Sequence, residues 1–263
     1  MNNSYYKDHW VEIEPARLDR YEAMFKWSPA VEVLLAPAGI APGQIVADFG
    51  CGPGFVAVEL ARRVGADGHV HAFDINADFI ARTRDRAASE GLSDRITAHQ
   101  LAGGVLPLDD NVLDRLVTKN VMVYVDDPAA SFREFQRVVK PGGVAHVVDS
   151  DFGMTVVDPV PAAQWRALLD AAAHAFRTPS IGRQLYGLAR GAGFADVTVE
   201  VVANPDTHGR MLHFVNNIAG YARDGGGNIG EDDIQNVVNI ATKALENGQF
   251  FALNPQFMVT CTV

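Results

Sequence analysis

Short apolar runs alternate with longer amphipathic segments through the first half of the chain. The runs predict strands at 45–49, 69–73, 96–100, 116–120 and 144–149. The segments between them carry apolar residues at three- and four-residue spacing, which is typical of helices with one buried face. Strands that alternate with helices in this way predict an α/β fold with a parallel sheet and right-handed connections.

The second half of the chain has a mainly helical pattern. Val197, Val199 and Val201 alternate with polar residues as in a half-buried strand, and a final strand is expected around 257–261. Helical spacing is also present before the first strand, over 10–36. The remaining helices are predicted at 161–176, 181–191, 213–223 and 232–246.

These elements predict one domain that spans residues 1–263. Its core is expected at 44–203 and 250–263. Residues 1–40 lie before the alternating strands and helices, and we expect them to form an N-terminal helical lid. Residues 205–248 lie between the last two strands, and we expect a helical cap insertion there. A length of 263 residues fits this organisation.

Composition narrows the possible partners and the compartment. The net charge is −10 and no basic run is present, so neither a nucleic acid nor an anionic membrane surface is expected as a partner. No apolar run is long enough to span a membrane, and the polar first residues do not predict a signal peptide. Cys51 and Cys261 are expected to be free buried thiols, which favours a cytoplasmic location.

The most informative motif follows the first predicted strand. Asp48, Gly50, Gly52 and Gly54 form Asp-x-Gly-x-Gly-x-Gly, and a predicted helix begins immediately afterwards. A strand, a glycine turn and a helix N-terminus together make a pocket for a nucleotide-like cofactor. Asp74 follows at the end of the second strand, where a carboxylate can hold a ribose diol.

The glycine spacing differs from the dinucleotide fingerprint Gly-x-Gly-x-x-Gly. Phe55 stands where the third glycine of that fingerprint would be, and Gly54 comes one residue early. Asp48 supplies a negatively charged partner for a cationic ligand. A pyrophosphate group, which is itself negatively charged, would not favour such a partner. A nicotinamide-dependent oxidoreductase is therefore a weaker hypothesis.

With these residues, the chain resembles the class I S-adenosylmethionine (SAM) methyltransferases. Leu106-Pro107 and the Lys140–Gly143 turn make it most similar to the branch that includes the ubiquinone/menaquinone C-methyltransferases. The resemblance implies an α/β fold with a Rossmann-like seven-stranded methyltransferase sheet, mostly parallel with an antiparallel last strand, plus helical cap elements. It also implies S-adenosyl-L-methionine as the cofactor and a small organic molecule as the substrate.

The resemblance assigns cofactor-binding roles to particular residues. Asp48 would contact the ammonium of the methionine end, and Asp74 would accept hydrogen bonds from the ribose hydroxyls. Ile75 would lie against the adenine ring. The loop residues Gly50, Cys51, Gly52 and Gly54 would bring their backbone close to the ligand.

The adenine end departs from the family pattern. The family usually carries an Asp four residues before the Leu-Pro dipeptide, and Ala102 stands there. Either the side chain of Gln100 or a backbone group near Leu101 would then have to bind the adenine amino group. Asn120 is expected either to line the methyl-transfer site or to be a simple turn residue. Tyr21 belongs to an aromatic-rich N-terminal segment that would cover the cofactor.

Two carboxylates belong to the carboxyl end of the fifth predicted strand. Asp149 and Asp151 would lie at its carboxyl end, where ligands of open α/β sheets bind. Either residue could act as a general base, orient a substrate, or simply cap the next loop. Arg183 could bind a substrate carboxylate or form an ion pair. No His or Cys cluster has metal-ligand spacing, so no metal is expected.

We hypothesise a methyltransferase that acts on a small organic molecule. The acceptor atom (O, N or C) and the oligomeric state stay open, because fold and cofactor motif are shared by all three chemistries. The same motifs would also fit a SAM-binding enzyme of this fold with non-methylating chemistry, or a non-catalytic binding module.

Overall fold

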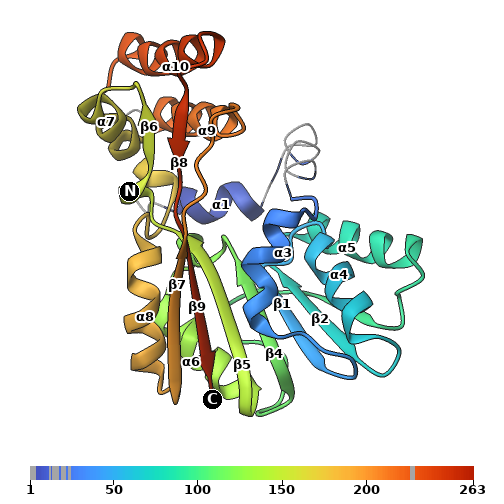
Figure 1. Cartoon of the computed structure of the whole chain (residues 1–263). Coiled ribbons are helices and arrows are strands. Elements are labelled where there is room, and N and C mark those ends of the chain that lie inside the picture. Colours follow the sequence, from blue (N-terminus) through green and yellow to red (C-terminus); the bar gives the residue numbers. More distant parts are fainter. Residues whose placement is uncertain (1–3, 12, 14–17, 19–21, 23–24, 226–228) are drawn as a thin grey trace.

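A computed structural model describes the chain except for residues 1–3, 12, 14–17, 19–21, 23–24 and 226–228 (Figure 1). The α-helices are α1 (Tyr5–Val11), α3 (Pro29–Leu35), α4 (Phe55–Val64), α5 (Ala77–Ser89), α6 (Pro128–Val138), α7 (Ala162–Ala172), α8 (Ile181–Ala192), α9 (Leu212–Asp224) and α10 (Glu231–Glu246). Short 3-10 helices are η1 (Ala36–Ala38), η2 (Met122–Tyr124), η3 (Phe152–Met154) and η4 (Ala173–Ala175). The strands are β1 (Ile45–Phe49), β2 (His69–Asp74), β3 (Ile96–Gln100), β4 (Leu113–Lys119), β5 (Val139–Ser150), β6 (Val156–Asp158), β7 (Asp196–Val202), β8 (Phe251–Leu253) and β9 (Gln256–Thr262).

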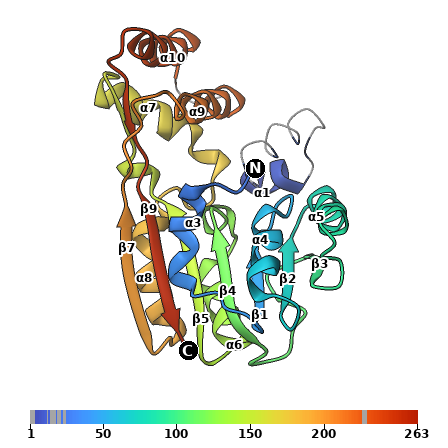
Figure 2. The ribbon, with the colours of Figure 1, turned by 45° about the vertical axis from the view of Figure 1, so that its right-hand side comes forward.

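The main sheet has seven strands in the order β3-β2-β1-β4-β5-β9-β7. β1 to β5 pair in parallel, and β9 is antiparallel to both of its neighbours, β5 and β7 (Figure 2). This order confirms the predicted Rossmann-like sheet with an antiparallel last strand. The strand order reverses between β1 and β4, and the carboxyl ends of both strands meet at that point, where ligands of such sheets bind.

Local signals in the sequence account for the helix boundaries. The side chain of Asn76 accepts a hydrogen bond from the backbone N–H of Phe79 at 2.8 Å, which caps α5. Asp127 caps α6 in the same way through Ala130, and Pro128 occupies the first helical position. Gly65 ends α4 with a φ of +71°.

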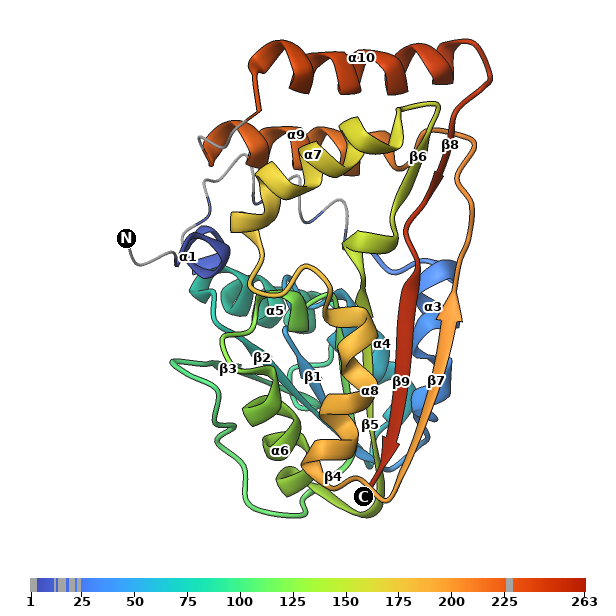
Figure 3. The ribbon, with the colours of Figure 1, turned by 90° about the vertical axis from the view of Figure 1, so that its left-hand side faces the viewer.

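Helices cover both faces of the main sheet (Figure 3). α3, α4 and α5 pack on one face through an apolar cluster that includes Leu35, Leu60 and Ile80. α6 and α8 pack on the other face through a larger cluster that includes Phe132 and Leu185. The larger cluster also contains buried residues of α7, α9 and α10. These helices are therefore attached to the sheet by apolar packing.

We use the name cap for the unit made of β6, α7, η4, α9, α10 and β8. It lies over the carboxyl ends of the parallel strands (Figures 1 and 2). α9 and α10 confirm the two helices predicted within 205–248. The cap also takes in residues 156–172, which the sequence pattern places with the core, and residues 251–253. The reason is that β6 pairs with β8 in a separate two-stranded sheet, and Trp165 and Leu168 of α7 are buried away from the main sheet.

Helical spacing was predicted over residues 10–36. The structure has α1, which ends at Val11, and α3, which begins at Pro29, while much of the stretch between them, including the predicted site residue Tyr21, lies outside the described residues. α1 bonds to both main parts of the fold. The hydroxyl of Tyr5 donates to Asp224 of the cap at 3.0 Å, and Tyr6 donates to Asp126 of the core. Among the helices that the structure describes, none has the length and apolar character needed to cross a membrane.

Candidate active site

The loop after β1 is held by the end of β2. The backbone N–H groups of Gly50 and Cys51 both donate to the carbonyl of Phe73 at 2.8 Å. One residue further on, the carboxylate of Asp74 accepts from the N–H of Gly52 at 2.8 Å and from the N–H of Asn76 at 2.9 Å. Asp74 therefore organises the glycine loop, while Asn76 caps the helix that follows. The ribose contact expected of Asp74 stays a prediction.

Two glycines in this loop have no room for a side chain. A Cβ on Gly50 would lie 2.2 Å from Cγ2 of Val121, and one on Gly54 would lie 2.7 Å from Oγ1 of Thr83. Both residues also have a positive φ, +78° and +85° respectively. The loop thus packs directly against the segment after β4 and against α5. Thr83, which no motif in the sequence marks, also donates its hydroxyl to the carbonyl of Gly52 at 3.0 Å.

Asp48 lies beneath the loop and is almost completely buried, with 3% of its surface exposed. Its Oδ2 atom has no hydrogen-bond partner among the described residues, although Ala57 at the start of α4 contributes a backbone hydrogen bond to the carboxylate. Burial raises the pKa of Asp48 to about 7, and the nearby charge of Asp74 adds to the rise. A buried carboxylate oxygen without a donor suits a cationic ligand group.

Other carboxylates near the strand ends share this electrostatic character. Burial raises the pKa of Asp74 to about 6, although backbone N–H groups oppose the rise. Burial likewise raises the pKa of Asp149 to about 7. Lys119, at the end of β4, lowers the pKa of both Asp48 and Asp149, and it is itself desolvated, which lowers its own pKa. The site therefore concentrates acidic groups around one ammonium.

The remaining predicted cofactor residues lie beside this loop, at or near the ends of β2, β3 and β4. Ile75 follows Asp74 and is half-buried against the larger core cluster. Gln100 ends β3, is exposed, and donates to the carbonyl of Ile75 at 3.3 Å. Leu101 donates its backbone N–H to the carbonyl of Asp74 at 2.8 Å. The backbone directly after β3 is thus hydrogen-bonded to Asp74, the residue that would hold the ribose.

Asn120 is exposed and adopts a φ of +58° directly after β4. Asn is one of the few residue types with a side chain that tolerate this conformation. The geometry therefore supports a turn function for this residue. Its backbone N–H donates to the carbonyl of Val148 at 2.9 Å, which keeps the strand ends of β4 and β5 together.

The two carboxylates at the carboxyl end of β5 are held by internal bonds. Asp149 accepts from the backbone N–H groups of Val123 at 3.1 Å and Ser150 at 2.8 Å. Asp151 is fully buried, accepts from the N–H of Gly153 at 3.0 Å, and forms an ion pair with both nitrogens of the Arg183 fork. These bonds favour loop capping, and a role as general base stays a prediction. Of the two roles expected for Arg183, the structure shows the ion pair.

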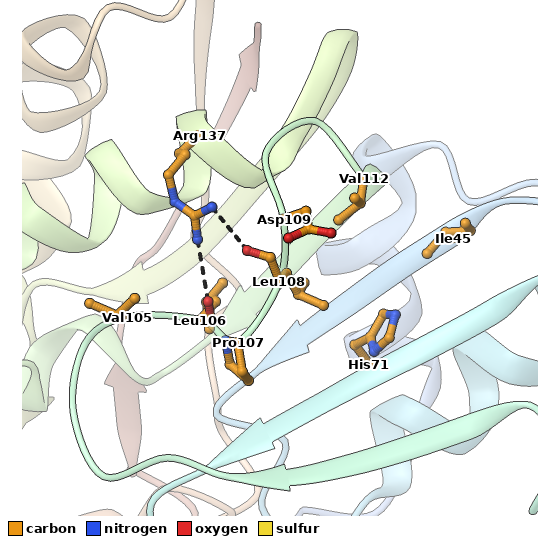
Figure 4. A pocket seen from close by; sticks show the side chains of 9 residues that line it. All are labelled: Ile45, His71, Val105, Leu106, Pro107, Leu108, Asp109, Val112 and Arg137. Atoms are coloured by element: carbon orange, nitrogen blue, oxygen red, sulfur yellow. Dashed lines mark hydrogen bonds between the residues drawn. The ribbon is translucent and has the colours of Figure 1, made fainter.

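A separate hollow lies on the α6 face of the sheet (Figure 4). It is lined by Leu106, Pro107 and Arg137, whose guanidinium donates to the carbonyls of Leu106 and Leu108. Its lining includes Ile45, the first residue of β1, so it lies toward the amino end of that strand, away from the glycine loop. We do not assign it to the cofactor. Among the described residues, no group of His, Cys, Asp and Glu side chains could hold a metal ion.

Comparison with known proteins agrees with this geometry. Residues 46–143 match the family model of a methyltransferase domain. The 2-phytyl-1,4-naphtoquinone methyltransferase of Nostoc punctiforme is 29% identical over 211 residues, which cover 74% of this chain and 86% of that protein. The ubiquinone/menaquinone biosynthesis C-methyltransferase UbiE of Xanthomonas axonopodis pv. citri is 37% identical over 115 residues, or 44% of this chain and 46% of that protein.

Residues 46–143 thus carry a methyltransferase domain, in agreement with the resemblance to the class I S-adenosylmethionine-dependent methyltransferases. S-Adenosylmethionine is the cofactor of this family, and two features fit it here: the glycine cradle and the buried oxygen of Asp48 without a donor. A phosphoethanolamine N-methyltransferase 2 of Haemonchus contortus matches 98% of this chain and 60% of its own chain, with a TM-score of 0.65 and 15% identity, which shows a shared fold. The chain spans about half the length of most of the curated relatives that it matches.

The first prediction concerns the packing of Gly50 on Val121. Replacing Gly50 with Ala should lower the free energy of unfolding by about 2–4 kcal/mol, since the methyl group both overlaps Val121 and disfavours the positive φ. The double variant Gly50→Ala/Val121→Ala should recover part of this loss. Urea denaturation of the wild type, both single variants and the double variant measures the coupling. The interpretation fails if Val121→Ala recovers nothing.

The second prediction concerns the proton on Asp48. Its raised pKa in the free protein means that a cationic ligand must displace a proton near pH 7, so cofactor affinity should fall as pH drops below about 7, approaching tenfold per pH unit for each coupled carboxyl. Calorimetric titration of S-adenosylhomocysteine at pH 6.5, in buffers of different ionisation enthalpy, should show proton release. Asp48→Asn should reduce that release. Binding with no net proton exchange in the wild type would contradict this assignment.

The third prediction separates anchoring from catalysis at Asp151. Arg183→Gln leaves a buried carboxylate without its cation, so the free energy of unfolding should fall. Asp151→Asn keeps an oxygen for Gly153 and should cost less. Thermal and urea denaturation of both variants provide the test. Asp151 would instead be identified as a base by a different result. In that case Asp151→Asn would keep its stability but lose turnover, and Arg183→Gln would keep both its stability and its turnover.

Proposed function

We propose that this protein transfers the methyl group of S-adenosylmethionine to a small organic molecule. The observation that carries the proposal is the combination of a buried, donor-free Asp48 oxygen with a loop whose glycines are clamped by Asp74. When bound, the cofactor supplies an activated methyl group on its sulfonium. The protein then has to bind, orient and shield the two reactants, because methyl transfer depends mainly on positioning.

Each part of the cofactor has a proposed partner. Asp48 binds the α-ammonium, and Asp74 accepts from the ribose hydroxyls while it holds Gly52 in place. Ile75 provides an apolar surface for adenine, and Gln100 or the backbone near Leu101 contacts the adenine amino group.

The further parts of the fold serve the substrate. The cap stands over the strand ends, and α1 bonds to it through Tyr5 and to the core through Tyr6. This arrangement supports a lid function for the N-terminal segment and a cap function for the helices that follow the sheet. The cap brings apolar and aromatic residues such as Phe214 and Tyr221 to this end of the molecule, which supports an organic substrate.

Two features support the proposed cellular setting. Cys51 and Cys261 are free and buried, as expected in the reducing cytoplasm. The net charge of −10 disfavours a nucleic acid as the methyl acceptor. We therefore propose a cytoplasmic enzyme that acts on a small molecule, with the acceptor atom left open.

The proposal predicts binding of S-adenosylmethionine and S-adenosylhomocysteine but not of NAD. The glycine spacing differs from the dinucleotide fingerprint, and the carboxylate of Asp48 suits a cationic group. Calorimetry with the three ligands tests the binding step. Incubation with methyl-labelled cofactor and a pool of small metabolites, followed by product separation, tests the transfer. Label in a small organic product supports methyl transfer. Cofactor-dependent conversion without transfer of label would favour non-methylating chemistry, and failure to bind S-adenosylmethionine would reject the proposal.

A further inference from the structure

Lys119 is the last residue of β4 and lies next to the glycine loop. β4 runs parallel to β1, with Val117 opposite Asp48 in the register. Residues opposite each other in a parallel pair, and residues two apart on one strand, point to the same face of the sheet. The side chain of Lys119 therefore leaves the sheet on the same face as that of Asp48, one step nearer the carboxyl ends of the strands.

The ammonium of Lys119 interacts electrostatically with two acidic groups, and among the described residues it is bonded to neither. Its charge interacts with Asp149 and Asp48. Within the described part of the chain, no ion pair or hydrogen bond joins Nζ to another residue. The side chain is half-buried and desolvated. This contrasts with Lys140, which pairs directly with Asp114 at 2.7 Å.

A desolvated ammonium without a bonded partner is costly for a fold, and a bound anion would offset that cost. Asp48 presents the opposite case on the neighbouring strand, because its buried Oδ2 has no donor among the residues that the structure describes. One face of the sheet thus carries, at neighbouring strand ends, one acceptor without a donor and one donor without an acceptor. An α-amino acid group, with its ammonium and carboxylate on one carbon, matches such a pair.

We propose that Lys119 binds the α-carboxylate of the methionine part of S-adenosylmethionine, while Asp48 binds its α-ammonium. The proposal rests on the proposed function, since it assigns a further residue to the same cofactor. It also explains the balance of charges at the strand ends. The cofactor brings two cationic groups and one anion, and the site offers the carboxylates of Asp48, Asp74 and Asp149 with one ammonium.

Three ligands separate the contacts of the amino acid group. S-Adenosylmethionine carries both the carboxylate and the ammonium, decarboxylated S-adenosylmethionine keeps only the ammonium, and 5′-methylthioadenosine has neither. Lys119→Met retains much of the side-chain length and removes the charge. Its dissociation constant for S-adenosylmethionine should rise about 10- to 100-fold, while those for the other two ligands should stay within about twofold.

Asp48→Asn serves as the matched variant for the other half of the pair. It should weaken both S-adenosylmethionine and its decarboxylated form, and leave 5′-methylthioadenosine nearly unchanged. Lys119→Arg keeps a cation and should recover part of the affinity that Lys119→Met loses. Calorimetry or equilibrium dialysis measures all of these constants without any need for a methyl acceptor.

Two results would overturn the proposal. Equal weakening of S-adenosylmethionine and its decarboxylated form by Lys119→Met would mean that Lys119 acts through the fold or on another part of the ligand. No weakening at all would mean that the ammonium does not contact the cofactor, as expected if it serves the substrate instead. Failure of the proposed function is a separate result, because the wild-type protein would then not bind S-adenosylmethionine.

Discussion

The carboxylate of Asp74 is the interaction on which the candidate site depends. Its two oxygens accept from Gly52 in the glycine loop and from Asn76 at the start of α5, so one side chain fixes two backbone segments. Asn76 extends the same chain of bonds, because its amide donates to the carbonyl of Trp10 at 2.8 Å in α1. A change at Asp74 would therefore disturb the loop, a helix start and the N-terminal segment together.

This arrangement connects cofactor binding with the position of the N-terminal segment. α1 is bonded to Asn76 beside Asp74, to Asp126 after β4, and to Asp224 in the cap. A ligand that contacts Asp74 would thus act on a residue two hydrogen bonds away from α1, through Asn76. Such a connection provides a physical route by which an occupied site can hold the lid and the cap together around a substrate.

The buried acids near the strand ends are a second constraint. In the absence of a cation, burial keeps Asp48 and Asp149 partly protonated near neutral pH, which lowers the cost of placing several carboxylates close together. Asp151 differs from these two residues, since an ion pair with Arg183 neutralises its charge and holds the turn after β5 in place. Carboxylates in neighbouring positions therefore differ in their pairing: Asp48 and Asp149 have raised pKa values, and Asp151 anchors the chain through Arg183.

The sequence by itself determined the elements that depend on local interactions. The strands of the parallel sheet and the glycine loop after β1 depend on residues close together in the chain, so spacing and residue type were sufficient to predict them. The caps at Asn76 and Asp127 depend on equally local interactions. The position of Asp74 at the end of β2 follows from the same local pattern. Its hold on Gly52 could not be predicted, because that bond depends on the register between β1 and β2.

Only the tertiary structure decided the contacts between distant segments. The pairing of β6 with β8 moved residues 156–172 from the predicted core into the cap, and no local signal in either short strand specifies that partner. The bond between Asp151 and Arg183 likewise forms because α8 returns its first turn to the end of β5. Lys119 is half-buried beside Asp48 because β4 lies next to β1 in the sheet, although 71 positions separate the two residues in the chain. Such juxtapositions depend on strand order and packing, which spacing along a single chain does not encode.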